Sequence, residues 1–282
     1  MKKFLNISRP RFWIYTAGPF WLSAALLYPL DGFIVPVLIM LSYFTFPANI
    51  LIYGINDIYD RDTDILNEKK GSYEHLLQSK DKKYLIYLIV LSNVPFWIYS
   101  VLFLPVVANI FLLIFILLAW QYSAPPIRAK ARPFLDSFFS GLLYIVPVGV
   151  SWGIVSGHAP VFLPMLAGFL WSYSMHVYSA IPDINADKEA GISTSATYFG
   201  KDTTVLFCGL LYTLSSIIAY YFIGFFSVII WLIYMVLIYL SYKKETPEGV
   251  LSIYKIFPLI NTLVGGMLFI IFLLLSQGVI SF

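Results

Sequence analysis

The sequence predicts an all-helical protein embedded in a membrane, and three observations lead to this fold class. Of the 282 residues, 60% are hydrophobic and only 12% are charged, whereas about 25% of the residues in an average soluble domain are charged. Apolar stretches recur along the chain at the length of about twenty residues that a helix needs to cross a bilayer. Lys and Arg occur only in alternate connections between these stretches, as is typical of loops on one side of a membrane.

Nine apolar stretches are long enough to be membrane-spanning helices. Short Pro and Gly punctuation separates neighbouring stretches, for example at Leu104–Pro105 and Ile223–Gly224. We expect one membrane domain, residues 1–282, in which the nine helices form a bundle around a cavity that opens to lipid. The expected helices cover residues 12–30, 33–55, 84–104, 106–123, 134–156, 160–182, 203–221, 224–242 and 256–277.

The basic residues indicate how the chain is inserted. All eighteen Lys and Arg residues lie in the N-terminal segment and in the connections 56–83, 124–133, 183–202 and 243–255. Nine helices place these segments on one side of the membrane, and the positive-inside rule makes that side cytoplasmic. We therefore expect a protein of the inner membrane of a prokaryotic cell, with a cytoplasmic N-terminus, cytoplasmic active-site loops and an external C-terminus.

Acidic residues gather where the second expected helix leaves the membrane, in the sequence INDIYDRDTD at 55–64. If this helix continues into the cytoplasm, Asn56, Asp60 and Asp64 follow one another at intervals of four residues and lie on one face. Asp57 lies beside this face, whereas Asp62 points away from it. The sequence therefore predicts a cluster of oxygen ligands at the end of this helix.

A second acidic cluster, PDINADKE at 182–189, follows the sixth expected helix, and Asp183 and Asp187 are again four residues apart. Four helices separate the two clusters, which suggests a pseudo-repeat of helices 1–4 and 5–8 with a site at the interface of the halves. Mg²⁺ prefers oxygen ligands and often binds them together with substrate phosphates. We expect Mg²⁺ as the cofactor, and the catalytic residues Asp60, Asp64, Asp183 and Asp187. The expected metal ligands are Asn56, Asp57, Asp60, Asp64, Asp183 and Asp187.

A calcium-binding loop and a solvated acidic loop both fit the first cluster less well than a magnesium site. Asp60, Asp62 and Asp64 match the start of a calcium-binding loop, but Ile65 stands where Gly is required and Gly71 where a bidentate Glu is required. A solvated acidic loop would account for one cluster alone. It does not account for two clusters with the same spacing after corresponding helices.

A basic connection, QYSAPPIRAKARP at 121–133, lies between the two acidic clusters in the sequence. Arg128, Lys130 and Arg132 alternate along it. Arg binds phosphate oxygens in a bidentate manner and Lys adds a point charge, so we predict that these three residues bind a diphosphate. Arg9 and Arg11 are expected to approach the same surface. The alternative is that this connection is basic only because it sets the topology.

Metal ligands and basic residues at the surface of a membrane suit a substrate with an anionic head and an apolar tail. An isoprenyl diphosphate is the simplest such donor, and the acceptor would be a lipophilic molecule from the bilayer. Metal ions and cations stabilise the leaving diphosphate, and aromatic side chains stabilise an allylic cation. The net charge of +3 suits anionic membrane lipid, and no segment is typical of nucleic-acid binding. A transporter with a cation site is the rival interpretation, but transporters carry their charges at mid-membrane.

The acidic motifs resemble those of a known family. NDIYDRDTD is similar to the N-D-x-x-D-x-x-x-D signature of the UbiA-type intramembrane prenyltransferases, and DINAD resembles their second motif, D-x-x-x-D. The resemblance implies an all-helical bundle, dependence on magnesium and transfer of a prenyl group to a lipophilic acceptor. It also implies that the residues listed above as metal ligands form the metal–diphosphate site.

Three segments point to one branch of this family, the lycopene elongases. They are SRPRFWIYTAGP at 8–19, SAPPIRAKARP at 123–133 and AIPDINADKEAGISTSATYFG at 180–200. The resemblance implies dimethylallyl diphosphate as the donor and a linear carotene such as lycopene as the acceptor. Quinone, chlorophyll-type and glycerol-ether lipid acceptors remain alternatives. Outside these motifs, Gly265 and Gly266 are expected to allow close packing of the last helix.

Overall fold

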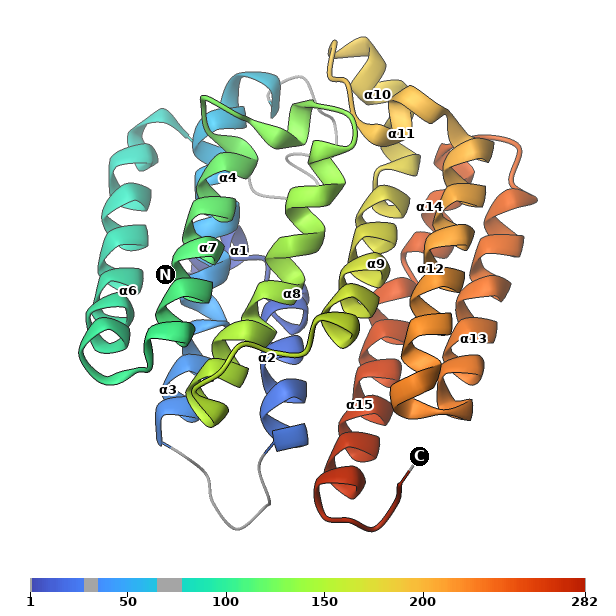
Figure 1. Ribbon diagram of the computed structural model, residues 1–282. Coiled ribbons are helices and arrows are strands. Elements are labelled where there is room, and N and C mark those ends of the chain that lie inside the picture. Colours follow the sequence, from blue (N-terminus) through green and yellow to red (C-terminus); the bar gives the residue numbers. More distant parts are fainter. Residues whose placement is uncertain (1, 28–34, 65–77, 282) are drawn as a thin grey trace. The chain divides into compact units, whose positions relative to one another are not determined.

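The computed structural model describes residues 2–27, 35–64 and 78–281 (Figure 1). Every regular element in these ranges is a helix, and none of them contains a strand. A helix satisfies its own backbone hydrogen bonds, as a chain in the hydrocarbon core of a bilayer must. The predicted all-helical fold is confirmed. The chain forms two compact units, Met1–Arg128 with Val146–Pro160 and Ala129–Ile145 with Val161–Phe282.

The first unit is organised around α4, which contacts α1, α3, α6 and α7. The first four predicted spans lie in this unit as α2, as α3 together with α4, as α6 and as α7, and the second half of α8 completes the unit. The elements are α1 (Lys2–Ile7), η1 (Pro10–Phe12), α2 (Ile14–Leu27), α3 (Val35–Tyr43), α4 (Phe46–Asp64), η2 (Ser79–Asp81), α6 (Lys82–Phe103), α7 (Val106–Ser123) and α8 (Leu135–Ser156).

The predicted span 33–55 is not one continuous helix, because a turn at Phe44 and Thr45 separates α3 from α4. The carbonyl of Phe44 accepts hydrogen bonds from Thr16 Oγ1 at 2.6 Å and from Asn49 Nδ2 at 3.2 Å. Polar side chains thereby satisfy a backbone group that the helix leaves unpaired, which makes the break tolerable inside a membrane. The core beside this turn is aromatic: the ring of Phe44 lies 5.2 Å from Phe20 and 5.3 Å from Phe115.

The second unit is organised around α12, which packs against α9 and α13. Its core contains the stacked rings of Tyr178 and Phe257 at 4.3 Å and of Tyr212 and Tyr234 at 4.5 Å. The elements are η3 (Ala129–Ala131), the first half of α8, α9 (Phe162–Ser179), η4 (Ile181–Asp183), α10 (Ile184–Glu189), α11 (Ser195–Phe199), α12 (Lys201–Ile223), α13 (Phe225–Tyr242), η5 (Glu248–Val250), α14 (Leu251–Tyr254) and α15 (Phe257–Ser276).

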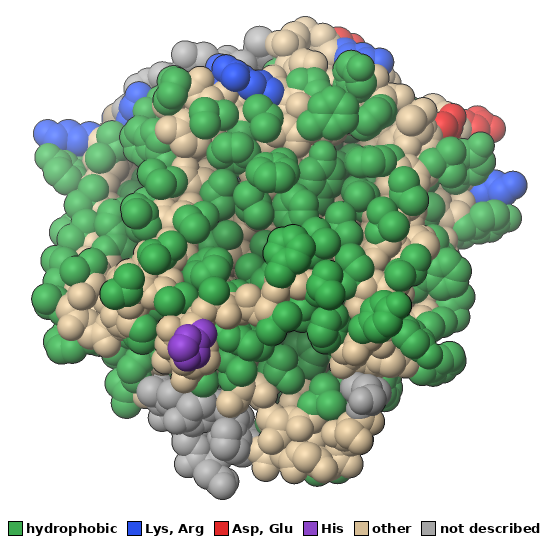
Figure 2. All heavy atoms as spheres, in the orientation of Figure 1, with side chains coloured by type: hydrophobic (Ala, Val, Ile, Leu, Met, Phe, Trp, Pro, Cys, Tyr) green, Lys and Arg blue, Asp and Glu red, His purple; other side chains and the backbone are tan. Residues whose placement is uncertain are grey.

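Seven helical segments in the described part of the chain are long and apolar enough to cross a membrane. The other two predicted spans correspond to α2, which is too short, and to α9, which contains several polar residues such as Ser172, Ser174 and His176. The predicted number of nine spans is therefore not confirmed. Hydrophobic side chains cover most of the face in Figure 2, as expected for a surface in contact with lipid.

The prediction for Gly265 and Gly266 is wrong. A Cβ atom built on either residue would meet no other described atom within 4 Å. The close helix contact instead occurs at Gly153 of α8, where a Cβ atom would lie 2.7 Å from the backbone nitrogen of Ala108 in α7. Sequence alone does not distinguish a glycine in a helix contact from one with open space beside it.

Candidate active site

The first acidic motif lies on a single uninterrupted helix, as predicted. α4 continues from Phe46 to Asp64, so Asn56, Asp60 and Asp64 follow one another one turn apart along it. Asp57 and Asp60 are 3% and 7% exposed, although both carry a carboxyl group. Buried carboxylates require compensating partners. The side chains of Asp62 and Asp64 lie outside the described part of the structure.

Asp57 is paired with an arginine from the N-terminal segment. Nη2 of Arg9 lies 3.5 Å from Oδ1 of Asp57. The Arg9 guanidinium also stacks over the ring of Tyr53, with Cζ 4.6 Å from the ring centroid. Because Tyr53 and Asp57 are one turn apart on α4, one arginine contacts both. As expected, Arg9 approaches the end of α4 that Arg128 also contacts, whereas the expectation for Arg11 remains a prediction.

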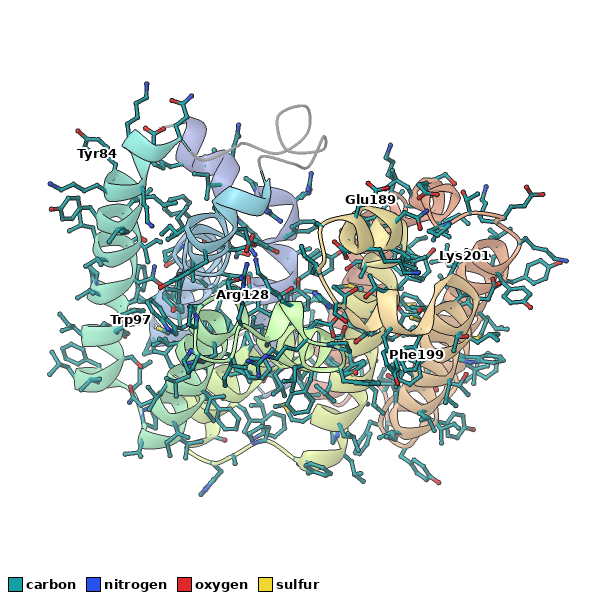
Figure 3. The ribbon with its side chains drawn as sticks, turned by 90° about the horizontal axis from the view of Figure 1, so that it is seen from above. Tyr84, Trp97, Arg128, Glu189, Phe199 and Lys201 are labelled. Atoms are coloured by element: carbon teal, nitrogen blue, oxygen red, sulfur yellow. The ribbon has the colours of Figure 1, made fainter. Side chains whose placement is uncertain are left out.

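Asp60 is paired with an arginine of the basic connection. Nη2 of Arg128, labelled in Figure 3, lies 3.5 Å from Oδ1 of Asp60. Arg128 has a positive φ of 46°, which is uncommon outside glycine. Its Nε atom is buried and has no hydrogen-bond partner in the described part of the chain. An orphaned buried donor of this kind is rare and indicates either strain or a missing ligand.

Asn56 is oriented by a residue that the sequence analysis did not identify. Its Nδ2 atom donates a hydrogen bond to Oγ of Ser123 at 3.2 Å, from the last residue of α7. Since the amide nitrogen is used in this bond, the amide oxygen is the atom that can bind a cation. Ser123 is fully buried. Its role depends on the packing of α7 against α4 and leaves no local signal in the sequence.

The second acidic motif has a different backbone from the first. α9 ends at Ser179, the 3-10 turn η4 covers Ile181–Asp183, and a separate short helix, α10, begins at Ile184. Pro182 lies in that turn and does not favour a continuous helix. Asp183 immediately precedes α10, and Asp187 lies one turn further along it. Both residues are half-buried, and both belong to the second unit.

The basic connection is divided between the two units. Arg128 ends the first unit, whereas Lys130 and Arg132 belong to the second. Lys130 lies in η3 and is half-buried, and Arg132 is exposed. The structure therefore brings one of the three predicted diphosphate ligands to the first acidic motif. The contribution of the other two remains a prediction.

A second group of polar residues fixes the chain that follows the basic connection. Asp136 is buried at the start of α8. Its Oδ1 and Oδ2 atoms accept hydrogen bonds from Oγ of Ser195 at 2.5 Å and from the backbone nitrogen of Ser195 at 2.9 Å. Oγ of Ser195 accepts a hydrogen bond from the backbone nitrogen of Phe134 at 2.8 Å. These bonds join α8 to α11 within the second unit.

In the part of the chain whose side chains are described, no three His, Cys, Asp or Glu side chains gather as a metal-binding group. The first motif presents instead the amide oxygen of Asn56 and the carboxylates of Asp57 and Asp60, and each of these two carboxylates has an arginine beside it. The assignment of the six acidic-motif residues as metal ligands therefore stays a prediction.

The sequence matches the UbiA prenyltransferase family over residues 12–248. The chain belongs to this family. Membership of this family identifies the protein as a prenyltransferase. The family and the apolar helices together identify it as an integral membrane protein. The predicted family and enzyme class are both confirmed.

Two relatives match nearly the whole of this chain. It is 38% identical to "Lycopene elongase/hydratase" from Halobacterium salinarum over 261 residues, which cover 92% of each chain. It is 35% identical to "Lycopene elongase/hydratase" from Haloarcula japonica, over 93% of this chain and 87% of the relative.

Solved UbiA structures share the fold. A UbiA homologue from Archaeoglobus fulgidus, bound to GPP and Mg²⁺, matches with a TM-score of 0.69 over 99% of this chain and 100% of that chain, at 18% identity. A UbiA homologue from Aeropyrum pernix in its apo form matches with a TM-score of 0.71 over 93% of this chain and 98% of that chain, at 17% identity. At these identities the comparison supports the fold alone.

Proposed function

We propose that the protein transfers a dimethylallyl group from its diphosphate to a linear carotenoid such as lycopene, in a reaction that requires Mg²⁺. The observation that carries this proposal is the 38% identity, over 92% of both chains, with the lycopene elongase/hydratase of H. salinarum. The three segments at 8–19, 123–133 and 180–200 that resemble lycopene elongases support the same acceptor. Quinone, chlorophyll-type and glycerol-ether lipid acceptors are the alternatives.

The residues of the first motif fit a magnesium ion. Mg²⁺ binds oxygen ligands and retains several waters or phosphate oxygens. α4 offers the amide oxygen of Asn56 and the carboxylate of Asp60 one turn apart, and Asp64 follows after one more turn. The arginines beside Asp57 and Asp60 indicate that this end of α4 favours cations.

We propose that the two acidic motifs together hold the metal and the diphosphate, with Asp60, Asp64, Asp183 and Asp187 as the residues essential for turnover. The proposed metal–diphosphate residues are Asn56, Asp57, Asp60, Asp64, Asp183 and Asp187. When bound, Mg²⁺ neutralises the charge that develops on the leaving diphosphate. A UbiA homologue of the same fold was solved with DMAPP and Mg²⁺ bound, which supports these two molecules as the ligands of the proposed site.

Arg128 is proposed to donate hydrogen bonds to the diphosphate. Its buried Nε–H donates to no acceptor in the described residues, so a diphosphate oxygen would satisfy it. Charge-assisted bonds from arginine to phosphate are stronger than neutral ones and fix the geometry of the anion. Lys130 and Arg132 are proposed to add positive charge to the same anion.

The reaction breaks the bond between the allylic carbon and the diphosphate oxygen, and the diphosphate leaves with the electron pair. The five-carbon cation then adds to a double bond of the acceptor. The new cation on the acceptor either loses a proton or takes up water and then loses a proton. The relatives' name includes both elongation and hydration, so the product carries either a new double bond or a hydroxyl group.

We also propose that the N-terminus and both acidic motifs are cytoplasmic in a prokaryotic inner membrane and that the C-terminus is external. Contacts within the first unit support this. Arg9 of the N-terminal segment, the end of α4 and Arg128 of the basic connection come together, as connections on one side of a membrane would.

Expression in a bacterium that accumulates lycopene tests the proposal. The expected result is a carotenoid heavier by one or two five-carbon units, with or without added water, in mass spectra of the extracted pigments. The Asp60→Ala variant, present in the membrane in equal amount, should leave lycopene unchanged. An unchanged pigment profile with the wild-type protein would contradict the carotenoid acceptor. Diphosphate release with another lipid acceptor would then identify the alternative.

A further inference from the structure

Arg9 has an unusual backbone conformation. Its φ of 49° and ψ of 70° lie in the left-handed region, which is costly for a residue with a Cβ atom. Pro10 follows it, and the backbone nitrogen of Arg9 donates a hydrogen bond to the carbonyl of Asn6 at 3.0 Å. A conformation of this kind persists only where the surrounding structure stabilises it, and it often marks a functional position.

The segment that carries Arg9 is fixed to α4. The helix α1 contacts α4, and the adjacent residues Ile7 and Ser8 are 2% and 0% exposed. Nε1 of Trp13 donates a hydrogen bond to the carbonyl of Ser8 at 3.1 Å and closes the segment on its other side. Arg9 is therefore held in place from both directions along the chain.

Contacts of the guanidinium group explain what this conformation achieves. The group lies over the ring of Tyr53 and beside Oδ1 of Asp57, so it provides a cation to a carboxylate whose side chain is only 4% exposed. Removing one partner of a buried ion pair leaves an uncompensated charge and is strongly destabilising. Removing both partners avoids that penalty.

The ion pair of Arg128 with Asp60 differs in exposure. The side chain of Arg128 is 43% exposed, compared with 18% for Arg9, and that of Asp60 is 10% exposed. The exposed part of the Arg128 side chain is therefore accessible to a ligand from the solvent. Arg9 is enclosed by its own segment and by the aromatic ring, so its partner Asp57 remains engaged.

We propose that Arg9 is a positioning residue that serves as the resident counter-ion of Asp57. This pair fixes the N-terminal segment to the end of α4 and leaves Asn56 and Asp60, with Asp64, to bind the metal in the first motif. The inference rests on the proposed function, because it assigns different roles to residues of the motif that is proposed to bind Mg²⁺. Asp57 then contributes through Arg9 and not as a direct ligand. This refines the set of six metal–diphosphate residues proposed above, in which the other five remain direct ligands.

A double-mutant cycle on the detergent-solubilised protein tests this assignment. The melting temperature is measured for the wild type, Arg9→Gln, Asp57→Asn and the double variant, first without divalent cations and then with MgCl₂. Each single variant should melt lower by about 3 °C or more. The double variant should lose less than the sum of the two single losses, because residues that contact each other in an ion pair are energetically coupled. Arg9→Lys, which keeps the charge, should recover part of the loss seen with Arg9→Gln.

The increase in melting temperature on addition of MgCl₂ is a second readout. An ion pair that only stabilised the fold, away from the metal site, would not change this increase. MgCl₂ should raise the melting temperature of the wild type and of the double variant alike, and should not raise that of Asp60→Asn. It should also raise the melting temperature of Arg9→Gln by more than that of the wild type, since the ion supplies the missing positive charge. Arg11→Gln is the matched control for stability. Arg11 lies in the same segment, is exposed and stacks on Phe12, so its loss should change the melting temperature little.

Two outcomes would overturn the assignment. In the first, the losses of the two single variants add up in the double variant. In the second, Asp57→Asn abolishes stabilisation by MgCl₂ as completely as Asp60→Asn, which would make Asp57 a metal ligand. These outcomes differ from failure of the proposed function. If the wild type is stabilised by MgCl₂ and the cycle is non-additive, but no carotenoid is prenylated, then the acceptor is wrong and the role of Arg9 stands.

Discussion

Arg128 and Asp60 are separated by 68 residues in the chain, yet Nη2 of Arg128 lies 3.5 Å from Oδ1 of Asp60. This contact joins the basic connection after α7 to the acidic end of α4. It places a cation that can bind phosphate beside a carboxylate that can bind magnesium. The pairing is compatible with the proposed metal–diphosphate site, in which arginine would bind the anion and the carboxylate the metal.

We predict that Asp60→Ala and Asp183→Ala each abolish the release of diphosphate from dimethylallyl diphosphate. The physical reason is the loss of metal-binding oxygen where charge develops on the leaving group, so the rate should fall by a factor of about 100–1,000 or more. The measurement is diphosphate release by purified protein with saturating MgCl₂. Full turnover by either variant would contradict the two-motif site.

Asp62→Ala is the matched control for these variants. Asp62 lies in the same motif, but the helical period directs it away from the face that Asn56 and Asp60 share. Its replacement should leave diphosphate release close to that of the wild type, since a residue on another face of the helix is not expected to bind the metal. An inactive Asp62→Ala variant would show that the helical-face argument assigns the wrong residues.

Arg128→Lys should weaken binding of the donor diphosphate. Lysine keeps the charge but cannot reproduce the bidentate hydrogen bonds of the guanidinium. A loss of about 1.4 kcal/mol would raise the KM for dimethylallyl diphosphate about tenfold. Steady-state kinetics at fixed acceptor concentration measures this. Lys243→Gln, which removes an exposed cation over Tyr239 in the second unit, should leave KM unchanged. Equal effects of both variants would reduce the role of Arg128 to general positive charge.

Ser123→Ala should impair the response to magnesium without preventing folding. Ser123 accepts the hydrogen bond that orients the amide of Asn56, and loss of such supporting contacts weakens metal binding by about tenfold or more. The MgCl₂ concentration for half-maximal diphosphate release measures the effect. Ser151→Ala is a matched control because Ser151 is also fully buried in the first unit but its hydroxyl has no hydrogen-bond partner in the described residues. No change with Ser123→Ala would exclude a role for this bond.

Gly153→Ala should destabilise the protein by about 1–3 kcal/mol, because the added methyl group overpacks a close contact. Its Cβ atom would lie 2.7 Å from the backbone nitrogen of Ala108. Thermal unfolding in detergent measures the loss. Gly266→Ala serves as the control, since its Cβ atom would meet no described atom within 4 Å. A Gly153→Ala protein as stable as Gly266→Ala would mean that α7 and α8 can separate at no cost.

The sequence predicted features that depend on local periodicity. The four-residue spacing of Asn56, Asp60 and Asp64 indicated a helix that extends beyond the apolar span, and α4 does continue to Asp64. The long apolar stretches indicated helices at nearly the right boundaries. Both patterns can be recognised within one local stretch of sequence, because a helix has a fixed period and a bilayer has a fixed thickness.

Features that depend on packing between distant residues could not be predicted. Ser123 and Ser195 are ordinary serines in the sequence, and only the folded chain brings them to Asn56 and Asp136. The break at Phe44 and Thr45 was missed for the same reason. The carbonyl of Phe44 accepts a hydrogen bond from Thr16 of another helix. The sequence around the break therefore still has the composition of one continuous span.

The most direct test of the account uses the purified protein in liposomes that contain lycopene, with dimethylallyl diphosphate labelled in its five-carbon part. Diphosphate release and transfer of the label to the pigment are measured together, with MgCl₂ and with EDTA. The account predicts that both occur with MgCl₂ in equal molar amounts, that EDTA stops both, and that Asp60→Ala shows neither. Transfer of the label that continues in EDTA, or diphosphate release that never labels the pigment, would contradict a magnesium-dependent carotenoid prenyltransferase.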